Sequence, residues 1–393
     1  MGSVSNPGSD WIEWQTLREL RATPAIFARL RECSGSELQV QARLRKEFPE
    51  SLVRGAISLQ ELRQKALAKF ALGDQLWLDR VGLEQCTSEL VAMHKSARFA
   101  GLVWDYCSGI GSDAAALSRR GCEVVTVDAD PACSLRTQWN AEILSPERAP
   151  LCVCARVEDL TDRSGLVHID PDRRVTQATR AVRIEDYVPG LQLLQSWTRE
   201  FAGGAIKLSP AANFGGKFTD AEIELVSVHG ECKEATVWFG RLAGEKPWRA
   251  TALPAGETLA GEPLEAVADI RPLGRYLFDP DPAIVRAGLV DLLAERLGLA
   301  RLDAAEEYLT GSSLIHSAFV RAFEVEAELS NNPKDLRAYY RTSTCGQLEI
   351  KCRHIPVDID RLRKQLVLPG TEAGVLIFAR ISGKARAVIA RRA

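Results

Sequence analysis

The chain has 393 residues, of which 46% are hydrophobic, and its formal net charge is −2 at pH 7. On a prior of about 150 residues per domain, this length predicts two or three domains with enough apolar residues to form their cores. The sequence contains no run of about 18 apolar residues and no basic-then-apolar leader, so we expect a cytoplasmic protein without membrane spans.

The cysteine and histidine pattern argues against disulfides and metal sites. The ten cysteines include no C-x-x-C pair, and the five histidines show no metal-ligand spacing. The closest cysteine pair, Cys152 and Cys154, alternates on a predicted buried strand. We therefore expect reduced core cysteines and no bound metal.

The N-terminal 75 residues predict a small helical domain. Apolar residues recur at helical spacing in residues 9–70, for example Trp14, Leu17 and Leu20. A further helix is predicted from Leu83 to Phe99, with Thr87 or Ser88 as its cap.

The segment 102–142 is the most informative part of the chain. It predicts a strand ending at Asp105, a turn C-S-G-I-G-S, an Ala-rich helix over 113–120, and a strand over 123–127 followed by Asp128. Glycines at 109 and 111 let the backbone approach a ligand, and an acid about 17 residues later is close to the offset of roughly 20 at which an acid binds a ribose. The spacing predicts a nucleoside ligand.

The loop composition narrows the kind of nucleoside. A dinucleotide fold prefers G-x-G-x-x-G to seat a pyrophosphate, but here Ala114 occupies the third glycine position. Asp113 would also place a negative charge in the first turn of the helix, where it repels phosphate. Both features favour a cofactor without phosphate, such as S-adenosylmethionine with its cationic sulfonium.

The chain then alternates strands and helices up to residue 240. Strands are predicted over 151–154, 166–169 and 204–208, a helix over 187–201, and a hairpin of strands 222–228 and 235–239 around His229-Gly230-Glu231. Glu158 and Asp159 follow the third strand and Asp170 follows the fourth. Alternating parallel strands and helices that end in an antiparallel hairpin predict an α/β domain.

The last part predicts a second, compact α/β module. Residues 242–263 are rich in Gly, Pro and Ala and predict a linker or long surface loop. A helix is predicted over 282–297, and strands are predicted near 319–327, 347–351 and 374–389. Residues 331–393 hold 13 lysines and arginines against 5 acids, a net charge of +8, so the rest of the chain carries −10. A basic module on an acidic body is typical of a protein that binds a polyanion.

These motifs resemble those of class I S-adenosylmethionine-dependent methyltransferases, in particular a bacterial family with a C-terminal THUMP-like domain. The segments L-W-L-D-R-V-G-L-E-Q-C-T-S-E from Leu76, D-Y-C-S-G-I-G-S-D from Asp105, and V-D-A-D-P from Val127 also resemble the catalytic domain of trimethylguanosine synthase. The likeness extends from about residue 76 to the C-terminus. It implies a Rossmann-like methyltransferase domain over 76–260 and a THUMP-like domain over 261–393.

The resemblance also implies roles for individual residues. In the relatives, the acid and glycines of the first loop hold the methionine end of the cofactor, which here points to Asp105, Gly109 and Gly111, and the acid after the second strand holds the ribose, which points to Asp128. The remaining candidates for the cofactor site are Thr87, Cys107, Ala129, Glu158 and Asp159.

The predicted catalytic loop departs from one known pattern. RNA guanine-N2 methyltransferases carry [DNS]-P-P-[FYW] after the fourth strand, whereas this chain has Asp170-Pro171-Asp172 followed by Arg173 and Arg174. This D-P-x-R-R form is similar to that of the THUMP-like family. Asp170 could accept a hydrogen bond from an acceptor amine, and the alternative is an Asp that caps the turn before Pro171.

Several other side chains are candidates for binding the acceptor. The two arginines could grip a phosphate or form a salt-bridged turn, and Lys207 could contact substrate or form a buried ion pair. The candidates for stacking a base are Phe214, Tyr187 and Trp77, each with a core role as the alternative. Lys351 and Arg353 could follow a phosphate backbone, because the resemblance implies RNA binding.

We therefore predict a methyltransferase that acts on a nucleobase amine of structured RNA, a tRNA or rRNA. The alternatives are a methyltransferase of a protein or small molecule, and an inactive RNA-binding protein.

Overall fold

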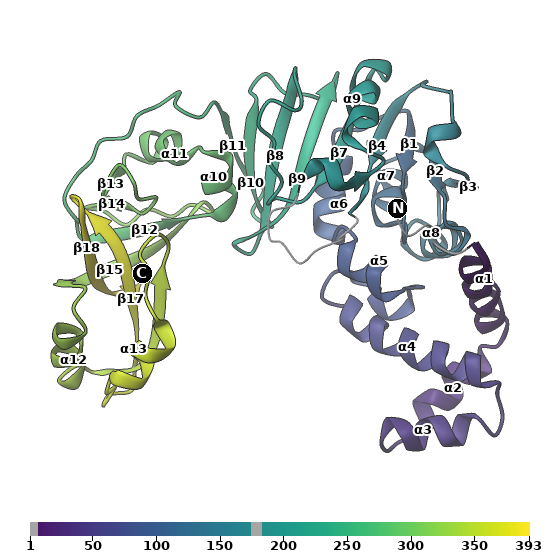
Figure 1. Cartoon of the computed structure of the whole chain (residues 1–393), viewed down its shortest axis with the longest axis horizontal. Helices are drawn as coiled ribbons and strands as arrows, with labels where there is room; N and C mark the ends of the chain where they lie inside the picture. The colour runs from purple at the N-terminus through teal and green to yellow at the C-terminus, as the bar shows by residue number, and fades with distance from the viewer. Residues whose placement is uncertain (1–6, 174–182) are drawn as a thin grey trace. The chain divides into compact units, whose positions relative to one another are not determined.

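The computed structural model describes residues 7–173 and 183–393. It divides into two compact units, one of Met1–Ala221 and Thr236–Ala243 and the other of Glu222–Ala235 and Gly244–Ala393. Figure 1 shows the elements of both. Within the described ranges, no helix is long and apolar enough to cross a membrane.

The N-terminal helices share a hydrophobic core with the domain that follows them. They are α1 (Pro7–Ala22), α2 (Ala25–Glu32), α3 (Glu37–Leu44) and α4 (Glu50–Ala66). Their buried apolar residues cluster with Trp77, Ile110 and Trp139, and the rings of Trp77 and Trp139 meet edge to face at 4.9 Å. Helix α1 lies beside α8 (Pro131–Leu144), as Figure 1 shows.

A parallel sheet forms the centre of the first unit. Its order is β3-β2-β1-β4-β7, followed by the last residues of β9, and the first five strands pair in parallel. The strands are β1 (Leu102–Tyr106), β2 (Glu123–Asp128), β3 (Leu151–Cys154), β4 (Leu166–Ile169), β7 (Gly203–Leu208) and β9 (Glu231–Gly240).

Helices cover both faces of this sheet because side chains alternate along each strand. Val103 of β1 packs with Leu117 of α7 (Ser112–Arg119), whereas Tyr106 packs against Trp197 of α9 (Leu191–Glu200). The layers are those of a doubly wound α/β domain, which confirms the predicted fold class.

Two predicted helices of this unit have different bounds. The predicted helix 83–99 is wrong, because the chain forms α5 (Arg80–Gln85) and α6 (Glu89–Ser96) with a break between them. Cys86 is extended at φ −60° and ψ 149°, which turns Thr87 toward Asp113. The predicted helix 187–201 starts only at Leu191, because Pro189 lacks an N–H and disfavours helix in the residue before it. Tyr187–Val188 is instead strand β6, which pairs with β5 (Asp172–Arg173).

The second unit begins with strands that the sequence only partly predicted. The hairpin of β8 (Ala221–Val228) and β9 turns at His229 and Gly230, both with positive φ, as predicted. The linker predicted over 242–263 is wrong, because this segment contains β10 (Trp248–Leu253) and β11 (Glu257–Gly261). Small residues such as Ala250 and Ala252 are buried in β10, so the composition that suggested a linker belongs to a packed strand.

The rest of the second unit is a seven-stranded sheet with helices. Its order is β13-β14-β12-β15-β18-β17-β16. The strands are β12 (Tyr276–Pro280), β13 (Ala300–Arg301), β14 (Leu309–Gly311), β15 (Val320–Ser330), β16 (Cys345–Cys352), β17 (Glu372–Ile381) and β18 (Lys384–Arg392). Two helices, α12 (Pro333–Arg341) and α13 (Ile359–Gln365), contribute Leu336 and Leu362 to the core on the face that carries Leu376 and Phe378.

Two predicted elements of this module are each divided by a glycine. The predicted helix 282–297 forms α10 (Pro282–Ala287) and α11 (Val290–Leu297), and Gly288 between them has φ 71°. The predicted strand 374–389 forms β17 and β18, which turn at Ser382 and Gly383 with φ 48° and 78°.

The compact units do not follow the predicted domain boundaries at residues 75 and 260. The N-terminal helices belong to the first unit and share its core. Strands β10 and β11, which were assigned to the segment 76–260, belong to the second unit. The division into domains 1–75, 76–260 and 261–393 therefore stays a prediction.

Candidate functional site

A cavity of about 760 Å³ lies in the first unit at the carboxyl ends of β1, β2 and β4. The loops after these strands contribute Ser108 to Ile110, Asp128 to Asp130 and Asp170 to Asp172 to its lining, and residues of α5 line another side. Ligands of open α/β sheets bind at this edge, and the volume suits a ligand of nucleoside size.

The loop after β1 brings the backbone to the cavity. Gly109 and Gly111 have φ of 56° and 83°, a conformation that glycine adopts without steric cost. A Cβ on Gly109 would meet no atom within 4 Å, whereas a Cβ on Gly111 would come within 2.9 Å of the Thr137 Cα. Gly109 therefore leaves room at the cavity, and Gly111 allows the loop to pack closely on α8.

Asp128 joins the loops that follow β1 and β2. Its Oδ2 accepts a hydrogen bond from the Gly109 N–H at 2.9 Å, and its Oδ1 accepts one from the Asp130 N–H at 2.9 Å. Burial raises the pKa of Asp128 to about 6, although both hydrogen bonds oppose that change. The carboxylate is held in place, and each of its oxygens retains a further lone pair toward the cavity.

A buried polar network lies beneath the loop. The Asp105 Oδ1 is 2.7 Å from the His168 Nδ1, and the Lys95 Nζ is 3.2 Å from the His168 Nε2 and 2.9 Å from the Asp113 Oδ1. Thr87 donates a hydrogen bond of 2.7 Å to the Asp113 Oδ2. Because the Lys95 ammonium has only donors, the Nε2 of His168 accepts from it, and the Nδ1 of His168 is the donor to Asp105.

Burial acts on both acids of this network. It raises the pKa of Asp105, and the partner His168 only partly offsets that effect. Burial also opposes ionisation of Asp113, but the Lys95 ammonium and the hydrogen bond from Thr87 bring the pKa of Asp113 below its usual value. Asp113 is therefore an anion at neutral pH, and it lines the cavity.

Asp170 and Lys207 form an ion pair at the ends of two neighbouring strands. The Lys207 Nζ is 2.6 Å from the Asp170 Oδ2 and also donates to the Gln85 carbonyl at 2.9 Å. Burial raises the pKa of Asp170, and Lys207 opposes this effect. The sequence left Lys207 as either a substrate contact or a member of a buried ion pair. The structure shows a partly buried ion pair, which links β4, β7 and the end of α5.

The structure brings most predicted site residues to one cavity. The residues that line it are Thr87, Cys107, Gly109, Asp128, Ala129, Glu158, Asp170, Pro171 and Asp172. Asp105, Gly111 and Asp159 do not line it, and Asp105 faces His168 instead. Arg174 lies outside the described residues, and so does the side chain of Arg173.

Sequence reasoning missed several residues at the cavity. Arg136 is buried there between Asp79, at 3.4 Å, and Glu13 of α1. Val188 and Pro189 also line it. The sequence held one signal for the buried network. Asp105 and His168 are in register on two strands that each precede a cavity loop, which would have predicted that their side chains meet.

The predicted base-stacking residues are core residues. Trp77, Tyr187 and Phe214 are only 9%, 4% and 7% exposed. The described residues that line the cavity include no phenylalanine, tyrosine or tryptophan. Among the described residues, the apolar part of the lining is therefore aliphatic and includes Pro171 and Pro189.

The basic residues predicted to bind RNA lie in the second unit. Lys351 and Arg353 pair with Asp279, at 2.8 Å and 2.6 Å.

A group of three possible metal ligands also lies in the second unit, which the sequence spacing did not indicate. The ligand atoms of Glu306, Glu307 and His354 are within 4.8 Å of one another. The Glu306 carboxylate accepts hydrogen bonds from the N–H groups of Glu307 and Arg380.

Comparisons with known proteins cover most of the chain. A family model described as THUMP domain-like matches residues 320–392. Two uncharacterised S-adenosylmethionine-dependent methyltransferases of Mycobacterium tuberculosis, from strains CDC 1551 / Oshkosh and H37Rv, are each 34% identical over 331 residues, which is 81% of this chain and 90% of theirs. The crystal structure of a proposed methyltransferase from Porphyromonas gingivalis W83 has a TM-score of 0.78 at 19% identity and covers 94% of this chain and 98% of its own.

The similarity to the mycobacterial proteins extends over most of both chains. The protein is thus a member of the class I S-adenosylmethionine-dependent methyltransferases, with a THUMP-like domain at its C-terminus.

Proposed function

We propose that this methyltransferase transfers a methyl group to a nucleobase amine of structured RNA, a tRNA or rRNA. The observation that carries the RNA assignment is the THUMP domain-like match at residues 320–392. The observation that supports an amine acceptor is the Asp170 carboxylate in the same cavity as the Gly109 loop.

The residues of the cavity fit the cofactor. Asp128 would accept hydrogen bonds from the ribose, the backbone at Cys107 and Gly109 would face the methionine end, and Glu158 would lie toward the adenine. The lining of the cavity is anionic and includes Asp79 and Asp113, so it suits a cationic ligand. S-adenosylmethionine supplies an activated methyl group on a sulfonium that is a good leaving group.

Asp170 would position the acceptor. Methyl transfer from a sulfonium requires mainly that the nucleophile and the methyl carbon be held in line. Lys207 binds one oxygen of Asp170, so the other is available to accept an N–H from the acceptor amine and direct its lone pair. Pro171 and Pro189 would contact the faces of the base.

Helix α12 supports contact with RNA. Lys334, Arg337 and Arg341 follow one another at three- and four-residue spacing, opposite the buried Leu336 and Tyr340. Among the described residues, none of these three side chains forms an ion pair, so their charges are available to phosphates. Arg173 and Arg174, which the sequence predicts as possible phosphate contacts, remain candidates for binding the same substrate.

A second candidate is a methyltransferase of a protein or small-molecule amine. The lack of an aromatic side chain among the described lining residues favours it, because relatives that methylate guanine carry an aromatic after the catalytic Asp. A third candidate is an inactive RNA-binding protein. The three domains and the cytoplasmic location predicted from the sequence remain part of the proposal.

Labelled methyl transfer tests the proposal. Wild type, Asp170→Ala and the exposed-site control Glu147→Ala would be incubated with labelled S-adenosylmethionine and with RNA, protein or metabolite fractions of cells that lack this gene. We expect label in RNA from wild type and Glu147→Ala, and none from Asp170→Ala. Label in the protein or metabolite fraction selects the second candidate, and cofactor binding without any transfer selects the third.

A further inference from the structure

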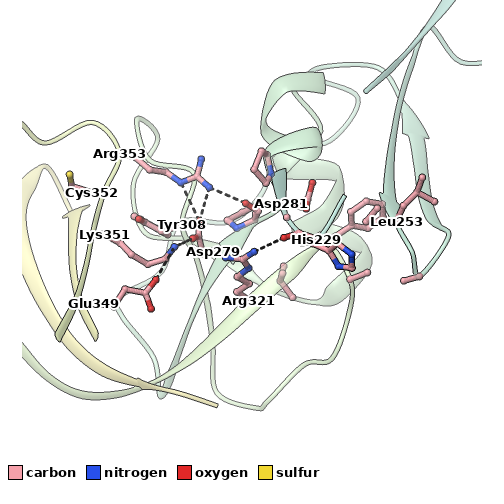
Figure 2. Close-up of a pocket in the computed structure, with 18 of the residues that line it drawn as sticks. His229, Leu253, Asp279, Asp281, Tyr308, Arg321, Glu349, Lys351, Cys352 and Arg353 are labelled. Carbon is pink, nitrogen blue, oxygen red and sulfur yellow. Dashed lines mark hydrogen bonds and ion pairs between the residues drawn. The ribbon is translucent and has the colours of Figure 1, made fainter. Parts of the chain in front are cut away.

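A separate cavity of about 860 Å³ lies in the second unit (Figure 2). It is lined by the turn between β8 and β9, the end of β10, the end of β12, the start of β15 and the residues of β16 around Lys351. Its volume is within the range of roughly 300 to 1,000 Å³ that is typical of small-molecule sites. No described residue lines both this cavity and the methyltransferase cavity.

The cavity is lined by three cations, Arg321, Lys351 and Arg353, and by three acids, Asp279, Asp281 and Glu349. The Asp279 Oδ2 is 2.8 Å from the Lys351 Nζ, and its Oδ1 is 2.6 Å from the Arg353 Nη2. Arg321 is the cross-strand partner of Asp279 on β15, and opposed residues project from the same face. Strands β12 and β16 are separated in the sheet by three others, so these side chains meet across the face of a curved sheet.

The other acids at this end have their own partners. Asp281 accepts a hydrogen bond from the Ala283 N–H at 2.8 Å. Glu349 is 2.7 Å from Arg392 and 3.8 Å from Lys351. Asp279 therefore serves Lys351 and Arg353, whereas the charge of Arg321 acts on Asp281 and lowers its pKa against the effect of burial.

Arg321 is held in place but has donors to spare. It donates one hydrogen bond to the described residues, from Nη2 to the His229 carbonyl at 3.1 Å. A Cβ on Gly230 would come within 2.1 Å of that Nη2, so the turn accommodates the guanidinium because residue 230 has no side chain. The remaining N–H groups of this fork match the geometry of a phosphate.

The lining away from Lys351 and Arg353 is partly apolar, and His229 also lies there. Figure 2 shows Leu253 there, away from Lys351 and Arg353. Leu253 and Phe319 are 7% and 0% exposed, and Pro282 also lines the cavity. A ligand with a charged group at one end and a ring at the other would match both ends.

We propose that this cavity binds a phosphorylated ligand of nucleotide size, with its phosphate at Arg321, Lys351 and Arg353. Arg321 supplies the bidentate contact, and Asp279 orients the other two cations. The apolar end receives the non-phosphate part of the ligand. This proposal does not depend on the acceptor of the methyl group.

Titration calorimetry of the full chain with inorganic phosphate and with a nucleoside 5′-monophosphate tests the site. We expect both to bind with saturation, the nucleotide more tightly, and Arg321→Gln to weaken both by about tenfold or more through removal of charge-assisted hydrogen bonds. The matched control Arg275→Gln removes an exposed arginine of the same unit that pairs with Glu324, and it should bind as the wild type does. Unchanged thermal unfolding and cofactor affinity show that the variants are folded.

Two results would overturn the proposal. One is the absence of saturable binding to the wild type, and the other is an equal effect of Arg321→Gln and Arg275→Gln. In either case the ion pairs only brace the sheet. A further titration with an oligoribonucleotide identifies the source of the phosphate: weaker binding by Arg321→Gln points to RNA, and unchanged oligoribonucleotide binding by a variant that no longer binds the mononucleotide points to a free metabolite.

Discussion

The acid after β2 links cofactor binding to pH. The pKa of Asp128 is raised to about 6 by burial, so the carboxylate is ionised at pH 7.5 and protonated at pH 5. An ionised carboxylate is the better acceptor for ribose hydroxyls, so affinity for S-adenosylmethionine should fall as the pH falls through 6.

Cofactor titrations between pH 5 and pH 8 measure this effect. Asp128→Asn should weaken binding at pH 7.5 by roughly 1.5 to 3 kcal/mol and remove most of the pH dependence. Asp170→Asn serves as a control that should retain the dependence. Equal pH profiles for wild type and Asp128→Asn would contradict the ribose role.

Lys207 should control the protonation of Asp170. Burial raises the pKa of Asp170 and Lys207 lowers it, so removal of the ammonium should raise that pKa further. Lys207→Met should therefore lose activity at neutral pH and recover part of it at higher pH, whereas Lys207→Arg keeps the ion pair and the wild-type profile. The measurement is the pH dependence of kcat/KM, and an unshifted acid limb in Lys207→Met would exclude this role.

At the scale of elements, the two glycines of the loop after β1 should have different roles: Gly111 in stability and Gly109 in cofactor binding. Gly111→Ala meets the Thr137 Cα at 2.9 Å with φ 83°, so we expect a decrease of about 1 to 3 kcal/mol in unfolding free energy. The Cβ of Gly109→Ala meets no atom within 4 Å, although residue 109 also has a positive φ. Beyond the backbone strain that both variants share, we therefore expect Gly109→Ala to lower cofactor affinity. Denaturant unfolding and cofactor titration of both variants check this, and equal effects of both variants on both quantities would refute it.

The sequence predicted the parallel strands well because each is a short apolar run bounded by glycine or polar residues. It failed where tertiary contacts override local pattern: the break after Gln85 depends on Thr87 reaching Asp113, and β10 depends on Ala250 and Ala252 being buried by neighbours. The pairing of Lys95 with His168 joins residues 73 positions apart, and only the tertiary fold brings them together.

At the scale of the whole molecule, the charge distribution predicts salt-sensitive RNA binding. Removal of one phosphate contact should reduce the slope of log affinity against log salt by roughly 0.7 to 0.9. Replacement of Lys334 and Arg341 by Gln on α12 should lower the slope by about two such steps, and Arg54→Gln on α4 should leave it unchanged. Filter binding across a salt series measures this, and identical slopes would exclude α12 from the RNA contact.

The sequence located the methyltransferase core and the basic C-terminal module at this scale. It could not show that Lys351 and Arg353 are engaged by Asp279, because that carboxylate lies 74 positions from Arg353 on a strand that is not its neighbour. It also could not show that the N-terminal helices complete the core around Trp77.

Nucleoside mass spectrometry of cellular RNA tests the central claim most directly. Total RNA would be digested from cells of the source organism that carry Asp170→Ala or, as a control, Glu147→Ala in the chromosomal gene. We predict that one N-methylated nucleoside disappears in the Asp170→Ala cells and persists in the Glu147→Ala cells. Identical nucleoside profiles in both strains, with both proteins present and binding S-adenosylmethionine, would contradict an RNA amine as the acceptor.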